Sequence, residues 1–355
     1  MITDTAVWND HAQLAQSSLD RLFGTDRPGH LENAHPAGSI GGDTFNYWWL
    51  AHVMDCRLDA YERTGDHRWT EAARDVRDEI VARNGGSLVN DYFDDMLWFA
   101  LALVRLFDAT GNQQDLTDAE FLVDHVIEHG WNDTLGESLA WRKQQLDYKN
   151  SPANGPLIIL ALRLAARIPA RDAQLAAYAG TAMDWWERTL VAEDGFVEDG
   201  INRAGDGRID VQWRFTYNQG LYLGACVEWF RRTGEGDYLV RARRTARTAI
   251  AELSDGSVFR AEGNGGDEGL FKGIFYRYLG LLIEALPEAD DDRRAFEDFV
   301  RRGTDALVAS ARREDELLRA GNDWTLREDG PIHYSTQLSA MKALEQRWRI
   351  EARVA

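Results

Sequence analysis

The sequence has few cysteines and a shortage of positive charge, and each shortage excludes a class of protein. Its 355 residues include only two cysteines, Cys56 and Cys226, which excludes a disulfide-stapled scaffold and predicts two buried free thiols. Forty basic residues stand against 59 acidic ones, so the net charge is −19. This excess of negative charge predicts no nucleic-acid partner, because phosphate binding needs clustered lysine and arginine, and it gives no charge attraction to an anionic membrane.

A long apolar run is absent as well. No segment approaches the roughly 20 uninterrupted apolar residues that a membrane-spanning helix needs. Residues 1–24 lack both the basic region and the continuous apolar region of a signal peptide. These absences predict a cytoplasmic protein, or a secreted one if a leader has been removed. With only seven prolines and no linker-like stretch, we expect a single domain over residues 1–355.

What the sequence does contain is a repeated helix ending. Residues 61–66, 107–112 and 230–235 share the pattern aromatic-x-x-Thr-Gly-polar after an apolar stretch of helical period. Glycine at this point is typical of a helix that stops in the left-handed conformation. Short hairpins are expected near residues 196–197 and 257–259. The periodicity predicts twelve helices, over residues 3–23, 44–64, 68–83, 92–109, 114–129, 153–167, 172–190, 216–233, 237–253, 268–285, 292–313 and 333–350.

These helices alternate between two kinds. Every second one is rich in aromatic and small residues, and the helices between them carry more charge. A helix that is apolar nearly all round belongs inside a protein, whereas an amphipathic one belongs outside. Six inner and six outer helices predict an all-α fold, an (α/α)6 barrel made of six helical hairpins. Polar residues cluster at the N-terminal ends of the inner helices, so we expect the active-site cleft there.

One of these ends reads NDYFDDMLWFA and holds two adjacent carboxylates, Asp94 and Asp95. A structural role is one reading, since Asp91 suits an N-cap and aspartate is favoured in a first helical turn. The pair lies beyond the cap, however, so capping needs only Asp91. Glycosidases use two carboxyl groups, and neighbours on one helix suit the separation of about 5–5.5 Å that retaining enzymes have. Different environments then give one carboxyl the role of acid and the other that of nucleophile.

Five stretches follow one another along the chain: YWWLAHVMDCRLDAYERTGD, NDYFDDMLWFALAL, YKNSPANGPLIILALRL, FTYNQGLYLGACVEWFRRTGE and DEGLFKGIFYRYLGLL. In these stretches and in their order, the chain resembles glycoside hydrolase family 76, the bacterial and fungal α-1,6-mannanases, over nearly its entire length. The resemblance implies an (α/α)6 barrel and endo-cleavage of α-1,6-mannan with retention. It also implies that Asp94 is the nucleophile and Asp95 the general acid/base.

One stretch departs from the family pattern. Where the family has a Gly-Gly-aliphatic-aromatic-Trp run, residues 135–142 read LGESLAWR, and only Gly136 and Trp141 match. We expect a bulkier loop with an extra acid at this place, which bears on the substrate length and linkage that the site accepts.

Further polar and aromatic residues near the same helix ends are candidates for binding sugar. Their side chains either contact sugar hydroxyls and rings, or cap helices and fill the core, and the sequence leaves both readings open. The candidates are Asn46, Trp48, Trp49, Asp91, Tyr92, Trp98, Trp141, Asn150, Asn154, Tyr217, Asn218, Gln219, Phe271 and Lys272.

Histidines offer two competing sites. His125 and His129 have the i, i+4 spacing of metal ligands, but they lie on a predicted outer helix without the adjacent glutamate of a zinc protease, which favours a surface role. His52 and His333 fall on inner helices, and sugar epimerases on similar barrels use a histidine pair. No dinucleotide, P-loop or calcium-loop pattern occurs, so we expect no cofactor and no metal.

Together these features predict a retaining endo-glycosidase that hydrolyses α-1,6-linked mannan or mannooligosaccharides through the Asp94–Asp95 pair. Its expected partner is a neutral oligo- or polysaccharide. Three alternatives stay open: a transglycosylase acting on α-mannan glycans, a sugar epimerase that uses His52 and His333, and a non-catalytic glycan-binding protein.

Overall fold

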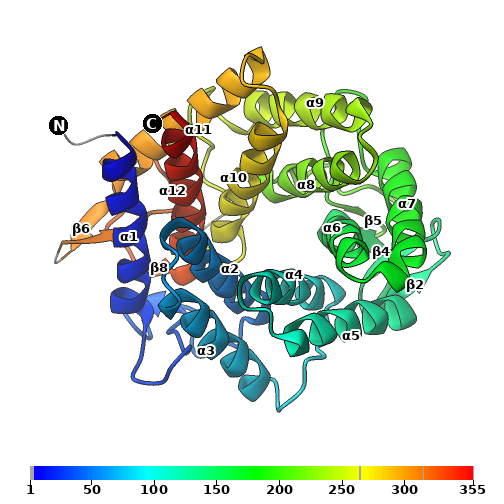
Figure 1. The fold of residues 1–355 in the computed structure, drawn as a ribbon, viewed down its shortest axis with the longest axis horizontal. Coiled ribbons are helices and arrows are strands. Elements are labelled where there is room, and N and C mark those ends of the chain that lie inside the picture. The colour runs from blue at the N-terminus through cyan, green and yellow to red at the C-terminus, as the bar shows by residue number, and fades with distance from the viewer. Residues whose placement is uncertain (1–3, 264, 315, 355) are drawn as a thin grey trace. The chain divides into compact units, whose positions relative to one another are not determined.

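The computed structural model describes residues 4–263, 265–314 and 316–354, and twelve α-helices occupy most of them (Figure 1). The predicted helices match these helices within a few residues, although residue 3 lies outside the described part. The helix predicted over residues 292–313 is too long at its C-terminal end. The observed helix stops at Ser310, and a short strand begins at Arg312. The helices are α1 Asp4–Phe23, α2 Tyr47–Thr64, α3 Arg68–Arg83, α4 Phe93–Thr110, α5 Gln113–Gly130, α6 Ser151–Arg167, α7 Asp172–Thr189, α8 Thr216–Thr233, α9 Gly236–Leu253, α10 Glu268–Ala285, α11 Asp291–Ser310 and α12 Tyr334–Val354.

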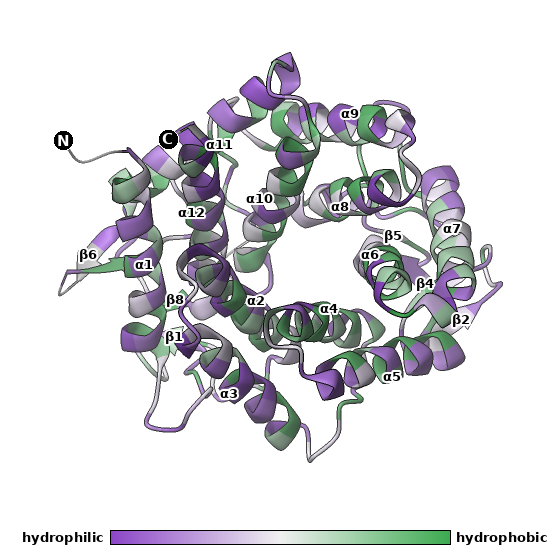
Figure 2. Cartoon of the chain, in the orientation of Figure 1, coloured by the Kyte–Doolittle hydropathy of each residue, from purple (hydrophilic) through white to green (hydrophobic). Residues whose placement is uncertain are grey.

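The chain forms two compact units. The first comprises Met1–Arg83 and Ile250–Ala355, and the second comprises Asn84–Ala249. In the first unit α12 packs against both α10 and α2, and in the second α6 packs against both α4 and α8. Each of these six helices is buried over most of its surface, whereas the helices between them bury one face. Figure 2 shows the contrast between the largely hydrophobic α4 and the hydrophilic faces of α9 and α11. The predicted alternation of inner and outer helices is therefore confirmed within each unit.

Three inner helices end as their sequences predict. Gly65, Gly111 and Gly234 have φ angles of 69°, 71° and 74°, in the left-handed region. Each donates its backbone N–H to the carbonyl four residues earlier, over 2.7–2.8 Å. A side chain with a Cβ atom is strained in this conformation, so glycine sets the point at which α2, α4 and α8 end.

The second unit contains a small antiparallel sheet that the helical periodicity did not predict. Its strands, in the order β2-β3-β4-β5, are Trp131–Asn132, Ser138–Arg142, Gln145–Asn150 and Gly200–Ile201. The buried Lys149 donates from Nζ to the carbonyls of Asn132 (2.6 Å) and Gly136 (2.5 Å), which fixes the β2–β3 turn, and burial lowers its pKa to about 8. Because β4 runs directly into α6, the sheet lies at the N-terminal end of an inner helix.

The two hairpins that we expected form only isolated bridges among the described residues, between Val191 and Val197 and between Ser254 and Phe259. Two further strand pairs lie in the first unit. Strand β1 (Ala34–His35) pairs with β8 (Ile332–His333), and β6 (Arg312–Glu314) pairs with β7 (Leu317–Arg319). Each strand is only two or three residues long, so the hydrophobic pattern carries little trace of it.

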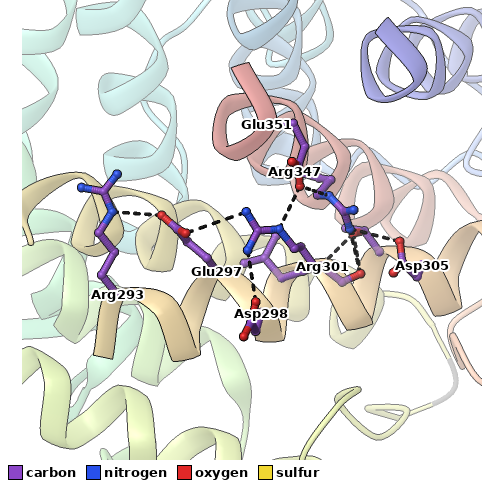
Figure 3. A network of polar contacts seen from close by, with 9 residues as sticks. Arg293, Glu297, Asp298, Arg301, Asp305, Arg347 and Glu351 are labelled. Atoms are coloured by element: carbon purple, nitrogen blue, oxygen red, sulfur yellow. Dashed lines mark hydrogen bonds and ion pairs between the residues drawn. The ribbon is translucent and has the colours of Figure 1, made fainter. Parts of the chain in front are cut away.

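A chain of ion pairs ties the outer helix α11 to the inner helix α12 (Figure 3). Arg301 on α11 contacts Glu297 and Asp298 on its own helix and Glu351 on α12, at 2.9 Å for Nε to Oε1 of Glu351. Arg347 on α12 contacts the same Glu351 oxygen at 2.7 Å. Because Glu351 is buried, its charge depends on these guanidinium partners for compensation.

The remaining global expectations concern the thiols and the membrane. Cys56 and Cys226 are both free and buried, as predicted. Burial raises the pKa of the Cys56 thiol to about 12, so it stays protonated and unreactive at neutral pH.

In the part of the chain that is described, no helix combines the length and the apolar character that crossing a membrane requires.

Candidate active site

The two adjacent carboxylates lie in the first turn of α4, and both side chains are half-buried. The predicted cap is wrong by one residue: the N-cap is Tyr92, whose side chain makes no capping hydrogen bond, while Asp91 is exposed. Met96 and Leu97 are fully buried and anchor the helix inward, as expected. Asp94 and Asp95 therefore lie at the partly exposed N-terminal end of α4, ahead of its buried middle.

Asn90 holds Asp95. Its side-chain Nδ2 donates to Oδ2 of Asp95 over 2.9 Å, and its Oδ1 accepts the backbone N–H of Tyr92 at 2.5 Å. A backbone N–H can only donate, so the amide of Asn90 has one permitted orientation, with its NH2 group toward Asp95. One oxygen of Asp95 is thereby assigned as a hydrogen-bond acceptor.

Trp141 on strand β3 holds the other carboxylate. Its Nε1 donates to Oδ2 of Asp94 over 3.2 Å. The indole ring lies 5.4 Å from the ring of Tyr92 and 5.6 Å from that of Tyr148, and the guanidinium of Arg142 lies 4.5 Å from its centroid. The stretch that departs from the family pattern therefore still delivers a tryptophan to the acid pair, and aromatic rings form a wall beside it.

A buried carboxylate, Asp199, forms the centre of a polar network that sequence reasoning missed. It accepts hydrogen bonds from Tyr148 (3.1 Å), Tyr217 (2.8 Å) and Asn218 (3.0 Å), and it is paired with Arg203 at 2.5 Å. Only 1% of Asp199 is exposed, so its charge needs these donors. Asp199 lies between the Val197 bridge and strand β5, in a segment without helical periodicity, and no pattern in the sequence marked it.

The same network places Tyr217 within electrostatic reach of the acid pair. Burial raises the pKa of Tyr217 well above its usual value, the negative charge of Asp199 adds to this, and the charge of Asp94 contributes as well. Its hydroxyl therefore stays protonated and remains a donor. Tyr217 and Asn218 begin α8, so in the second unit the N-terminal ends of α4 and α8 meet at one polar site, together with the sheet that precedes α6.

Other predicted binding residues of the second unit have visible structural roles. Asn150 caps α6 by accepting from the backbone N–H of Ala153 at 3.1 Å. Asn154 is fully buried and bonds both backbone groups of Leu139. Gln219 is fully buried and bonds both backbone groups of Val197 in the same way. These three side chains therefore cap a helix or bind buried backbone groups, which is the structural role that the sequence left open beside sugar binding. Trp98 is 5% exposed and belongs to the core.

Two of the predicted residues of the first unit contact an acid that was not predicted. Trp48 and Trp49 both donate from Nε1 to Oδ1 of Asp267, over 3.1 and 2.7 Å. Phe271 lies 6.4 Å from the ring of Trp48. Lys272 is buried instead and donates to the carbonyl of Asn322. Asn46, the N-cap of α2, donates from its side chain to Asn33.

The histidines have different surroundings. His52 is 3% exposed, and burial, aided by Lys342, lowers its pKa to about 3, so it is neutral at any physiological pH. Such a ring is a poor proton carrier, which does not favour an epimerase that uses His52. His125 and His129 stack on the outer helix α5 with ring centroids 4.1 Å apart.

Comparison with known proteins decides the family. A model of glycosyl hydrolase family 76 matches residues 8–351. The chain belongs to this family. Being a family-76 member, it shares its fold with solved structures over nearly its entire length, and the predicted (α/α)6 fold class is confirmed. The Lin0763 protein from Listeria innocua is 43% identical and has a TM-score of 0.92, with 98% of each chain covered.

Two other relatives of this family-76 chain have names that state an activity. An α-1,6-mannanase of Salegentibacter sp. HEL1_6 is 34% identical with a TM-score of 0.89, over 97% of this chain and 99% of that one. It was solved as an inactive variant, with asparagine at two consecutive aspartates, in complex with α-1,6-mannotriose. The mannan endo-1,6-alpha-mannosidase DCW1 of Candida albicans is 25% identical over 282 residues, and the match spans 71% of this chain and 60% of the relative.

Proposed function

We propose that this protein is a retaining endo-glycosidase that hydrolyses α-1,6-linked mannan or mannooligosaccharides, with Asp94 as nucleophile and Asp95 as general acid/base. The observation that carries this proposal is the geometry of the pair in the second unit. The two carboxylates are consecutive, half-buried and held by different donors, Trp141 for Asp94 and Asn90 for Asp95. Two identical side chains in different surroundings are what a two-role mechanism requires.

The inactive Salegentibacter variant supports a role for a consecutive aspartate pair, because two consecutive aspartates were replaced in it and α-1,6-mannotriose was bound. The family match runs through both units, which supports treating residues 1–355 as one catalytic domain. The location, cytoplasmic or secreted if a leader has been removed, stays a prediction, which fractionation of the producing cells and assay of the medium would test.

The reaction proceeds in two displacements. The Asp94 carboxylate attacks the anomeric carbon while the glycosidic C–O bond breaks, and the protonated Asp95 gives its proton to the leaving oxygen. Asp95, now a carboxylate, takes a proton from water, and the resulting hydroxide attacks the anomeric carbon and releases Asp94. Two inversions at one carbon give net retention. The indole N–H of Trp141 favours the charged, attacking form of Asp94.

Digestion of linear α-1,6-mannan and α-1,6-mannotetraose, followed by proton NMR, tests the proposal. We expect mannooligosaccharide products whose α-anomer forms first, because retention preserves the configuration. Initial formation of the β-anomer would contradict the retaining mechanism. Accumulation of transfer products in place of free oligosaccharides would instead support the transglycosylase alternative.

Variants of the acid pair test the residue roles. Asp94→Asn and Asp95→Asn should each abolish turnover and leave the circular dichroism spectrum and the melting temperature nearly unchanged. The matched control is Asp291→Asn, since Asp291 also belongs to an acidic pair in the first turn of a helix, the outer helix α11. Normal hydrolysis by both acid-pair variants would refute the assignment.

A further inference from the structure

Asp267 stands at the start of α10 in the first unit and does not act as a cap. It occupies the N-cap position with φ −61° and ψ −44°, and its side chain makes no capping hydrogen bond. Aspartate at an N-cap ordinarily accepts a backbone N–H from the first turn. The side chain is exposed and is used for another contact instead.

That contact is with two consecutive tryptophans of α2. Nε1 of Trp49 donates to Oδ1 of Asp267 over 2.7 Å, and Nε1 of Trp48 donates to the same oxygen over 3.1 Å. Two donors hold Oδ1 in place and leave the other oxygen, Oδ2, without a hydrogen-bond partner among the described residues. Charge-assisted hydrogen bonds are roughly twice as strong as neutral ones, so Oδ2 is a strong, oriented acceptor.

An aromatic surface lies beside this acceptor. The ring of Trp48 is half-buried, and it is held in place by edge contact with His52, at 5.5 Å between centroids, and by Phe271 at 6.4 Å. The His52 contact is edge-on and the Phe271 ring is tilted by 32° to the indole, so two neighbours restrain a ring that stays partly exposed. The C–H face of a sugar ring can stack on such a surface while its hydroxyls reach a nearby acceptor.

A hydrogen-bond donor completes the arrangement. Nδ1 of His333 accepts the backbone N–H of Gly266 at 3.0 Å, so the proton of the neutral ring is on Nε2. Burial lowers the pKa of His333, which favours this neutral form at physiological pH. The ring lies 5.6 Å from that of Trp49, and it is flanked by Gly41 and Gly265, where an added Cβ atom would come within 3.3 and 3.1 Å of its nitrogens.

We propose that Asp267, Trp48 and His333 form a subsite for one uncharged mannopyranose unit of the substrate. Oδ2 of Asp267 accepts hydrogen bonds from sugar hydroxyls, Nε2 of His333 donates to a sugar oxygen, and the sugar ring stacks on Trp48. An anionic sugar is repelled by the carboxylate. Because mannan is the ligand, this subsite depends on the function proposed above, but it is a binding site and takes no part in bond cleavage.

Isothermal titration calorimetry tests the subsite without turnover. The Asp94→Asn/Asp95→Asn protein is titrated with α-1,6-mannotetraose, alone and combined with Asp267→Asn. Losing a hydrogen bond to a charged acceptor should raise Kd about tenfold or more, whereas the exposed control Asp291→Asn should leave Kd within twofold.

A second variant keeps the test decisive if Asp267→Asn lowers the melting temperature. Trp48→Phe keeps an aromatic ring and all of Asp267, and it removes one donor from Oδ1, so a smaller rise in Kd is expected. An unchanged Kd in both Asp267→Asn and Trp48→Phe would overturn the subsite. Mannan hydrolysis by the parent enzyme would still support the proposed function in that case. The subsite for an uncharged sugar would also be overturned if the protein bound glucosamine tightly and Asp267→Asn abolished that binding. In that case the carboxylate would bind a cationic sugar. Absence of both mannotetraose binding and mannan cleavage in the parent would refute the function itself.

Discussion

Asn90 donates from its side-chain amide to Oδ2 of Asp95, and the same amide accepts the backbone N–H of Tyr92. The second bond prevents the amide from flipping, so Oδ2 of Asp95 always faces a donor. A proton carried by Asp95 therefore belongs on its other oxygen, Oδ1. In the proposed mechanism Asn90 is a positioning residue that selects which oxygen delivers the proton.

Asn90→Ala should lower kcat on α-1,6-mannan by about tenfold to a hundredfold, because the carboxyl of Asp95 is free to rotate away from the leaving oxygen. A dinitrophenyl α-1,6-mannobioside needs no proton on its leaving group, so its cleavage should fall much less. Kinetics on both substrates measure the difference. Asn112→Ala is the control, since Asn112 also accepts a backbone N–H two residues ahead, at the start of α5. Equal losses on both substrates would argue against a role in proton delivery.

Trp141→Phe tests the donor to Asp94. The variant keeps an aromatic ring and loses the N–H, and a hydrogen bond to a charged group is worth about 1.5–3 kcal/mol. We expect kcat/KM on mannan to fall about tenfold to a hundredfold with an unchanged melting temperature. Trp131→Phe is the matched control in the same sheet, because its Nε1 donates to the exposed Glu137. A loss of the same size in both variants would indicate damage to the sheet instead.

Asp199→Asn should lower the stability of the protein as well as its activity on mannan. Replacement of the buried carboxylate leaves Arg203 with less compensation and weakens the bonds to Tyr217 and Asn218. We expect the free energy of unfolding to fall by about 3 kcal/mol in urea titrations. Asp206→Asn breaks an exposed ion pair with Arg208 and should change it by less than about 1 kcal/mol. Equal stability of the two variants would show that the network contributes little.

The buried carboxyl group of Glu345 should make the stability of the protein depend on pH. Burial raises its pKa to about 7 from the usual 4.5, although Arg63 lies 3.0 Å away and opposes the shift. Between pH 4.5 and 7 the unfolded chain loses this proton while the folded protein keeps it, so rising pH favours unfolding. Relative to Glu345→Gln, the parent should lose on the order of 3 kcal/mol of unfolding free energy over that range.

Urea unfolding of the parent and of Glu345→Gln at several pH values measures this loss. Glu62→Gln serves as the control, because Glu62 forms a half-exposed ion pair with Arg349. Parallel pH profiles for the parent and Glu345→Gln would mean that Glu345 ionises at the same pH in the folded and unfolded states.

Much of the fold was predictable because helices depend on local patterns. The apolar period of α4 and the glycine at residue 111 act over a few neighbouring residues, and both are visible in the sequence. The short strands were missed for the opposite reason. Trp131–Asn132 obtains its hydrogen bonds from residues 138 and 139, and Gly200–Ile201 obtains them from β4, about 50 residues earlier.

For the candidate site, the sequence by itself determined the acid pair, its place in a first helical turn and the family. It also named Trp141, but not its bond to Asp94. Only the tertiary structure decided which side chains surround the candidates: Asn90 beside Asp95, Asp199 behind Tyr217, and Asp267 between two indoles. The physical reason is that a hydrogen bond is set by distance and direction in space, and loops and short strands bring together donors and acceptors that are far apart along the chain.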